Sequence, residues 1–150
     1  MKSSALLGGL LATSLIVCAI LIGTSLATFV DTISMTFITV GTLLFLLQAH
    51  GTAGLGTIRK ATGHWLKKNP YNPAELPDAS CVVRSGTRGM YLVATVAAFI
   101  GMIQIMRHLA DPAHLGPAMS VMFLCLFYTL CTHLVFWYPL GRWLEQQSRT

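Results

Sequence analysis

The sequence predicts an all-α membrane protein with four transmembrane helices arranged as two hairpins. Hydrophobic residues make up 54% of the chain and charged residues only 10%, against about 25% charged in ordinary soluble domains. Four apolar runs approach the roughly 20 residues that a membrane helix needs. Because lipid cannot satisfy the backbone of a lone strand or loop, each run is predicted to be a helix. The predicted helices cover residues 5–23, 33–48, 90–106 and 117–138.

The first hairpin joins the helices at 5–23 and 33–48 through a turn that contains Asp31 and no basic residue. In its second helix, Thr36, Thr39 and Thr42 form a slowly drifting hydroxyl stripe, which favours packing or hydrogen bonding between helices. A cleaved signal peptide is the alternative for the N-terminal segment, with Ser25-Leu26-Ala27 as its cleavage site. The apolar run is longer than the usual h-region of roughly 7–15 residues.

The middle segment, residues 49–89, is rich in Gly, Thr, Lys and Pro and is predicted to be mainly a loop. Within it, residues 58–66 fit a short basic amphipathic helix at the membrane surface, with Ile58, Trp65 and Leu66 toward lipid. The prolines at 70, 73 and 77 should break any helix there. Residues 77–89 are expected to be a loop, or a short helix from Ala79. About 40 residues are too few for an independent soluble domain, so residues 1–150 are predicted to form one membrane domain.

The second hairpin carries its turn chemistry between Arg107 and Pro117, where Asp111-Pro112 and Gly116-Pro117 interrupt two apolar runs. Arg107 is the only basic residue in either outer turn. Six Lys and Arg residues lie in the middle segment, and the others flank the termini. The positive-inside rule therefore places both termini and the middle segment in the cytoplasm. The excess of Lys and Arg on the cytoplasmic side accounts for the net charge of +5. Basic segments beside a membrane attract anionic lipid headgroups, so the charge does not require a nucleic-acid-binding function.

Few residues suggest chemistry. The sequence has no nucleotide-binding or hydrolase motif and no Cys/His metal spacing, so no cofactor or metal is expected. All five carboxylates fall in predicted loops or helix ends, although intramembrane ion carriers usually need an ionisable group within the span. His133 is the one titratable candidate for a proton relay, and a hydrogen-bonded structural histidine is the alternative.

Two semi-polar stripes appear on the second hairpin. Cys125, Thr129 and Thr132 share one face of the fourth helix, and Tyr128 lies beside it. Thr95, Ala98 and Met102 share a face of the third helix. These faces suit a pore lining or a cradle for a partner helix. They equally suit hydrogen bonding inside a four-helix bundle, and the pattern alone leaves both open.

Several motifs resemble the MotA/TolQ/ExbB family, with the MotA branch closest. The first hairpin has IGTSLATFVDTISMTFITVGT at residues 22–42. The second has IGMIQIM (100–106), LADPAHLGPAMSV (109–121), Tyr128 and FWYPL (136–140), in the family's order and spacing.

This resemblance implies a multi-pass protein of the bacterial inner membrane that forms a pentameric ring. The ring would surround two copies of a single-helix, MotB- or ExbD-like partner whose aspartate carries the ion. The resemblance assigns the third and fourth helices to the inner wall, and Pro139 to the cytoplasmic end of the fourth helix. The lining positions that it implies are Thr95, Ala98, Gly101, Cys125, Tyr128, Thr129 and Thr132.

The chain also departs from the family pattern. Ala98 stands where many relatives have Thr, a Thr pair is missing near Cys125, and Tyr91 stands where a proline is common. The middle segment is much shorter than the rotor-contacting region of MotA proteins. The expectation is therefore a reduced stator, or an energiser with another client, that acts as the pore wall of a proton- or sodium-driven motor. The rivals are a non-conducting scaffold and a small membrane enzyme. Close packing at Gly8, Gly9, Gly41 and Gly101 is expected to hold the oligomer together.

Overall fold

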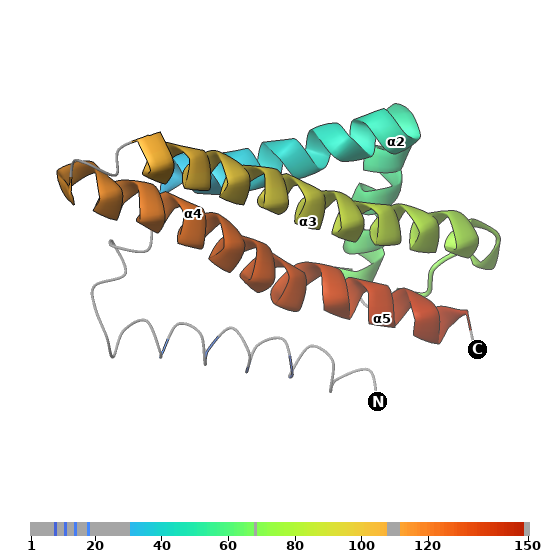
Figure 1. Ribbon diagram of the computed structural model, residues 1–150. Coiled ribbons are helices and arrows are strands. Elements are labelled where there is room, and N and C mark those ends of the chain that lie inside the picture. Colours follow the sequence, from blue (N-terminus) through green and yellow to red (C-terminus); the bar gives the residue numbers. More distant parts are fainter. Residues whose placement is uncertain are drawn as a thin grey trace.

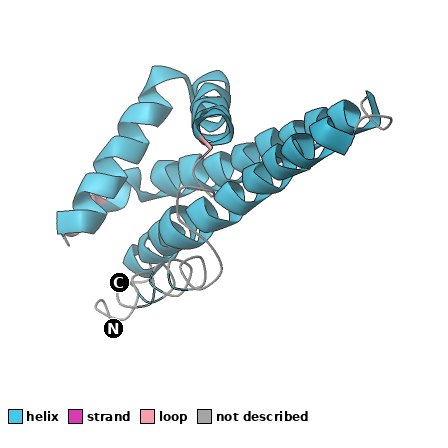
Figure 2. Cartoon of the chain, turned by 90° about the vertical axis from the view of Figure 1, so that its left-hand side faces the viewer, coloured by secondary structure: helices cyan, strands magenta, loops and turns pink. Residues whose placement is uncertain are grey.

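The computed structural model describes residues 31–67, 69–107 and 112–148, together with the single positions Gly8, Leu11, Ser14 and Cys18. These described parts contain helices and loops and no strand (Figure 2). Three of the helices are long and apolar enough to cross a membrane. The first predicted helix, residues 5–23, lies outside the described residues except for those four single positions, which are helical.

The described chain runs through three long helical units that lie beside one another (Figure 1). They are α2 (Thr32–Lys67), α3 (Leu76–Arg107), and α4 (Pro112–Thr132) continued by a π-helix, η3 (His133–Trp137), and by α5 (Tyr138–Gln147). A short 3-10 turn, η2 (Pro73–Glu75), precedes α3. The second hairpin is thus helical where the sequence predicted it, but both of its helices are longer than expected.

Asp31 fixes the start of α2. Its carboxylate accepts hydrogen bonds from the backbone N–H groups of Ile33 (3.3 Å) and Ser34 (3.1 Å), and from the Ser34 hydroxyl. These bonds satisfy N–H groups that have no partner within the first turn of a helix. The Ser34 hydroxyl bond also lowers the pKa of Asp31 below its usual value, and the two backbone bonds act in the same direction. Asp31 therefore remains a charged cap.

Residues 49–89, predicted to be mainly a loop, are mostly helical, and the short helices expected at 58–66 and from Ala79 are parts of longer ones. α2 continues past Gln48 to Lys67, and α3 begins at Leu76. Gly51 bends α2 with φ 63° and ψ −164°, a combination that is essentially restricted to glycine. Beyond Gly51 the helix turns away from the long axis of the bundle and crosses toward α5 (Figure 1). The predicted break near residues 69–73 is confirmed, since residues 69–72 are not helical. The break predicted at Pro77 is wrong, because Pro77 lies in the first turn of α3.

The fourth helix does not end before Pro139. Proline has no N–H and its ring clashes with the carbonyl four residues earlier, which normally breaks a helix. Here the backbone widens into η3, and the Tyr138 N–H reaches the carbonyl of His133, five residues back. The helix then continues as α5 to Gln147. Residues 112–117, predicted as part of a turn, are likewise the first turns of α4.

Packing divides the described chain into two regions. In the first, which we call the apolar arm (residues 32–50, 90–107 and 115–132), α2 buries one stripe made of Ser34, Ile38, Thr42 and Leu46. In the second, the compact end (residues 51–67, 71, 76–89 and 137–147), side chains from α2, α3 and α5 form a core. Ala61, Ala79, Leu140 and Leu144 are all fully buried there.

Glycines on α3 let bulky neighbours approach closely. A Cβ built on Gly86 would lie 2.2 Å from the Trp137 ring, and one on Gly89 would lie 2.1 Å from the Phe45 ring. Two of the glycines predicted to hold the oligomer together serve inside the chain instead. A Cβ on Gly41 would meet Val93 at 2.6 Å, and one on Gly101 would meet Met122 at 2.8 Å. Both positions are therefore occupied by contacts within the protomer.

Candidate functional site

The apolar arm exposes large hydrophobic side chains on every one of its helices. Examples are Ile33 (76% exposed), Phe99 (59%) and Leu130 (60%). An apolar surface of this extent belongs against lipid or against other helices. The three segments of the arm, residues 32–50, 90–107 and 115–132, contain no Asp or Glu. The arm therefore presents apolar faces to its surroundings and supplies no carboxylate of its own.

The predicted stripe on the fourth helix divides into a buried and an exposed part. Cys125 and Thr129 are 3% and 2% exposed, because they face the other helices of the same chain. The Thr129 hydroxyl donates to the Cys125 carbonyl at 2.8 Å, within its own helix. Thr132, one turn further on, is exposed. Of the α4 stripe, only Thr132 lies on a surface that another molecule can reach without displacing packed helices.

The predicted face on α3 is also mixed. Thr95 is exposed, and its hydroxyl donates to the Tyr91 carbonyl at 2.8 Å. Ala98 is half-buried and Met102 is 47% exposed. Gly101 is buried against Met122 of α4. The α3 face thus offers Thr95 as its exposed hydroxyl.

Tyr128 has a structural role that its position in the sequence did not reveal. Its hydroxyl oxygen accepts a hydrogen bond from the backbone N–H of Asp31 at 2.8 Å. This bond ties the middle of α4 to the first residue before α2, although the two residues are 97 positions apart. The capping pattern at Asp31 and Ser34 marks a helix start in the sequence, but it does not identify Tyr128 as the partner of the Asp31 N–H.

His133 opens the π-helix and packs beside two tyrosine rings. Its ring centroid lies 5.4 Å from that of Tyr91 on α3 and 6.3 Å from that of Tyr138 on α5. Its Nδ1 atom is buried and has no hydrogen-bond partner within the described part of the chain. Pro139, the other residue singled out at this end, is buried. The structure therefore brings His133 to the junction between the apolar arm and the compact end.

Hydroxyl groups from two predicted stripes meet at one cavity. This cavity, of about 270 Å³, lies among α2, α3 and η3, and three threonines line it: Thr39, Thr42 and Thr132. The Thr39 and Thr42 hydroxyls donate to carbonyls four residues earlier, at 2.8 and 2.7 Å. The remaining lining is apolar or aromatic: Ile38, Leu43, Leu46, Ile58, Met90, Phe136 and Trp137. The spacing of each stripe predicts a shared face on its own helix, but it does not predict that Thr132 lines the same cavity as Thr39 and Thr42.

The remaining candidates for chemistry are metal-binding clusters and cysteines among the residues that the structure describes. No group of three or more His, Cys, Asp or Glu side chains there could hold a metal ion. The cysteines described are free: Cys18 and Cys81 are exposed, Cys131 is half-buried and Cys125 is buried.

Comparison with known proteins adds no assignment: no family model matches the chain, and no curated protein matches it significantly.

Proposed function

We propose that this chain is a wall subunit of an ion-driven membrane complex, with several copies surrounding a single-helix partner that carries the titrating acid. The observation that carries the proposal is the apolar arm, whose helices all expose large apolar side chains and contain no carboxylate. Such an arm has surface for neighbouring helices, but it has no acid with which to bind or relay an ion. The acid must then come from another chain.

The exposed hydroxyls indicate where the partner helix would pack. Thr132 borders the cavity that also holds Thr39 and Thr42, and Thr95 is exposed on α3. In this proposal these positions face the partner, while Cys125 and Thr129 stabilise the wall from inside the protomer. Five copies in a ring, a fourth helix at residues 5–23, and a bacterial inner-membrane location with both termini cytoplasmic belong to the same proposal. They rest on the sequence resemblance.

A non-conducting scaffold is the second candidate, and the burial of Cys125 and Thr129 favours it. Several threonine hydroxyls of the arm, including those of Thr95 and Thr129, donate to carbonyls of their own helix. These hydroxyl hydrogens are used within the wall, so the hydroxyls cannot also donate to a water or a partner and keep only their oxygen lone pairs. A scaffold would keep the ring architecture and use the apolar faces only to assemble partners.

Assembly is tested first, by electron cryomicroscopy of the full chain expressed alone. A five-fold ring supports the wall-subunit proposal and its scaffold variant. A monomer, or a dimer whose α4 faces only lipid, would overturn both.

Labelling of single cysteines then separates conduction from scaffolding. In a variant without native cysteines, Thr132→Cys is compared with Leu130→Cys, which lies on the opposite side of the same helix and is 60% exposed. A water-lined path predicts that a membrane-impermeant maleimide labels Thr132→Cys in assembled protein and leaves Leu130→Cys unlabelled. Equal protection of both positions would favour the scaffold.

A further inference from the structure

The outer face of α2 beyond Gly51 contains a hollow surrounded by basic side chains. Its volume is about 610 Å³, and its lining consists of Gly56, Arg59, Lys60, Gly63, His64, Lys67 and Asn69. Gly56 and Gly63 are seven residues apart and so lie on one face of the helix. A Cβ built on either would meet nothing within 4 Å. Backbone therefore forms the floor of the hollow, and the longer side chains rise around it.

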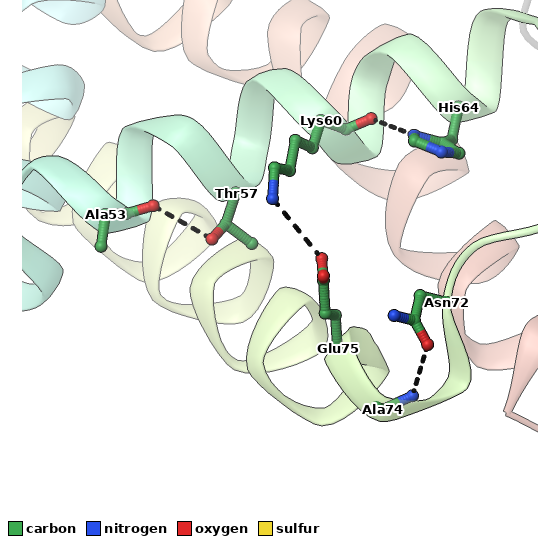
Figure 3. A network of polar contacts seen from close by, with 7 residues as sticks. All are labelled: Ala53, Thr57, Lys60, His64, Asn72, Ala74 and Glu75. Atoms are coloured by element: carbon green, nitrogen blue, oxygen red, sulfur yellow. Dashed lines mark hydrogen bonds and ion pairs between the residues drawn. The ribbon is translucent and has the colours of Figure 1, made fainter.

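Positive charge dominates this hollow. None of the seven lining residues is acidic. The nearest counter-charge is Glu75, whose carboxylate lies 3.8 Å from the Lys60 ammonium, with both side chains about half exposed or more (Figure 3). Such an exposed pair contributes little and is readily exchanged. Arg59 and Lys67 have no ion pair within the described residues. An anion placed here would relieve repulsion among three cations.

The donor set suits a phosphate group. A guanidinium presents a planar fork that matches two phosphate oxygens, and ammonium groups add mobile donors. His64 Nδ1 lies 2.9 Å from the Lys60 carbonyl, and since a carbonyl only accepts, Nδ1 carries the hydrogen. In the neutral ring the other nitrogen, Nε2, can only accept a hydrogen bond, so the cationic donors that line the hollow for a phosphate are Arg59, Lys60 and Lys67. The ring of His64 is held by Tyr71 at 5.3 Å in an edge-to-face contact.

The hollow also lies where a membrane headgroup would be found. The compact end holds six of the seven Lys and Arg residues that the structure describes, and only Arg107 lies at the other end. The α2 segment that carries the hollow crosses the bundle immediately beyond the apolar arm (Figure 1). Basic sites at this level of a membrane protein attract anionic headgroups.

We infer that this hollow is a binding site for a phosphate-bearing anion, either the headgroup of an anionic phospholipid or a soluble phosphate compound. The inference goes beyond the proposed ion-driven function and does not depend on it. It would hold equally for a wall subunit or a scaffold.

The test uses the full chain in a neutral detergent and two probes. Native mass spectrometry counts phosphatidylglycerol molecules retained against phosphatidylcholine, and thermal unfolding is followed with pyrophosphate against chloride at equal ionic strength. Because a ligand that binds only the folded state raises its stability, the unfolding midpoint reports occupancy.

Three variants locate the binding. Arg59→Gln/Lys67→Gln removes two charges from the hollow, and Gly63→Leu fills it without changing charge. Arg84→Gln/Arg88→Gln is the matched control, because it removes the same charge from α3. At roughly fivefold in affinity for each basic residue near an anionic group, the first variant should bind about 25-fold more weakly. Gly63→Leu should also lose binding, and the control should lose much less.

The outcomes separate the two sources. Selective retention of phosphatidylglycerol without a pyrophosphate effect identifies a lipid headgroup, and an effect of both probes identifies a general phosphate site. If neither probe binds, or if the control variant weakens binding as much as Arg59→Gln/Lys67→Gln, the hollow is not a site. Full binding by Gly63→Leu would overturn the inference in the same way.

Discussion

Substitution of Gly86 by alanine tests the close contact between α3 and the π-helix. The added Cβ would lie 2.2 and 2.5 Å from two atoms of the Trp137 ring, whereas non-bonded carbons are comfortable at about 3.5–4.0 Å. The ring would have to retreat by about 1.3 Å, the difference between 3.5 and 2.2 Å. Trp137 is only 5% exposed and packs edge-to-face on Phe136, so it has little room.

We expect Gly86→Ala to lower the free energy of unfolding by about 2–3 kcal/mol, toward the upper part of the range for overpacked cores. Gly63→Ala is the matched control, because its Cβ meets nothing within 4 Å. Alanine is favoured over glycine inside a helix, so this variant should gain about 0.5–1 kcal/mol. The same chemical change thus has opposite signs at the two positions.

The assay is reversible unfolding in mixed micelles of dodecyl maltoside and dodecyl sulfate, followed by circular dichroism at the helix band. A double-mutant cycle with Trp137→Phe isolates the contact, because the changes in unfolding free energy caused by substitutions at two contacting residues are not additive. The smaller ring should recover about 1–2 kcal/mol of the Gly86→Ala loss. A Gly86→Ala protein as stable as wild type, or a loss unchanged in the Trp137→Phe background, would refute the reasoning.

Three further substitutions probe the bend, the cap and the buried phenol. Gly51→Ala should cost about 1–3 kcal/mol of unfolding free energy because only glycine readily adopts this backbone conformation; Gly56→Ala, which meets nothing within 4 Å, is the control, and equal stability of the two variants would contradict the argument. Asp31→Ala should cost about 1 kcal/mol through loss of the helix cap. Because the folded-state pKa of Asp31 is lowered, the charge-dependent part of this difference should be complete above pH 3.8 and disappear as the pH falls further; a pH-independent difference in denaturant titrations would show that charge plays no part. Tyr71→Phe should be neutral or up to about 1 kcal/mol more stable, since the buried Tyr71 hydroxyl has no hydrogen-bond partner among the described residues. Burial first, then the nearby Glu75 and Asp78 carboxylates, raises the pKa of Tyr71 above 10.0, so wild type should lose stability relative to Tyr71→Phe as the pH rises beyond 10.0; a clear loss of thermal stability in Tyr71→Phe at neutral pH would contradict this account.

The middle segment shows why the helix boundaries were predicted only in part. Its glycines, threonines and prolines have poor helix propensity, so the sequence favoured a loop. Propensity differences of at most about 1 kcal/mol per non-proline residue are small beside tertiary packing. Here Ala61 and Ala79 are fully buried and Tyr71 contacts both His64 and Trp143, at ring-centroid distances of 5.3 and 6.2 Å. The Tyr71–Trp143 contact joins residues far apart in the chain, and packing of this kind stabilises the segment as helix.

The stripes of the apolar arm illustrate a second limit. Cys125, Thr129 and Thr132 were placed on one helical face from spacing alone, and α4 is helical through all three. The same spacing suits a face that packs within the protomer and one that packs against another chain. Only the position of the other helices shows that Cys125 and Thr129 are buried while Thr132 is exposed.

The sequence by itself determined the helical, apolar character of this protein, the break near residues 69–73, and the concentration of basic residues between 59 and 88. These features depend on composition and on interactions between residues that are close in the sequence, so the sequence alone is enough to predict them. Three features are known only from the tertiary structure: α2 bends at Gly51 and crosses the bundle, a π-helix precedes Pro139 and lets the helix continue, and the Trp137 ring packs against Gly86. The Gly86 contact depends on a ring 51 positions away in the sequence, which no local pattern predicts. The bend at Gly51 and the π-helix before Pro139 are choices among backbone conformations that the local sequence allows, and the packed bundle selects one of them.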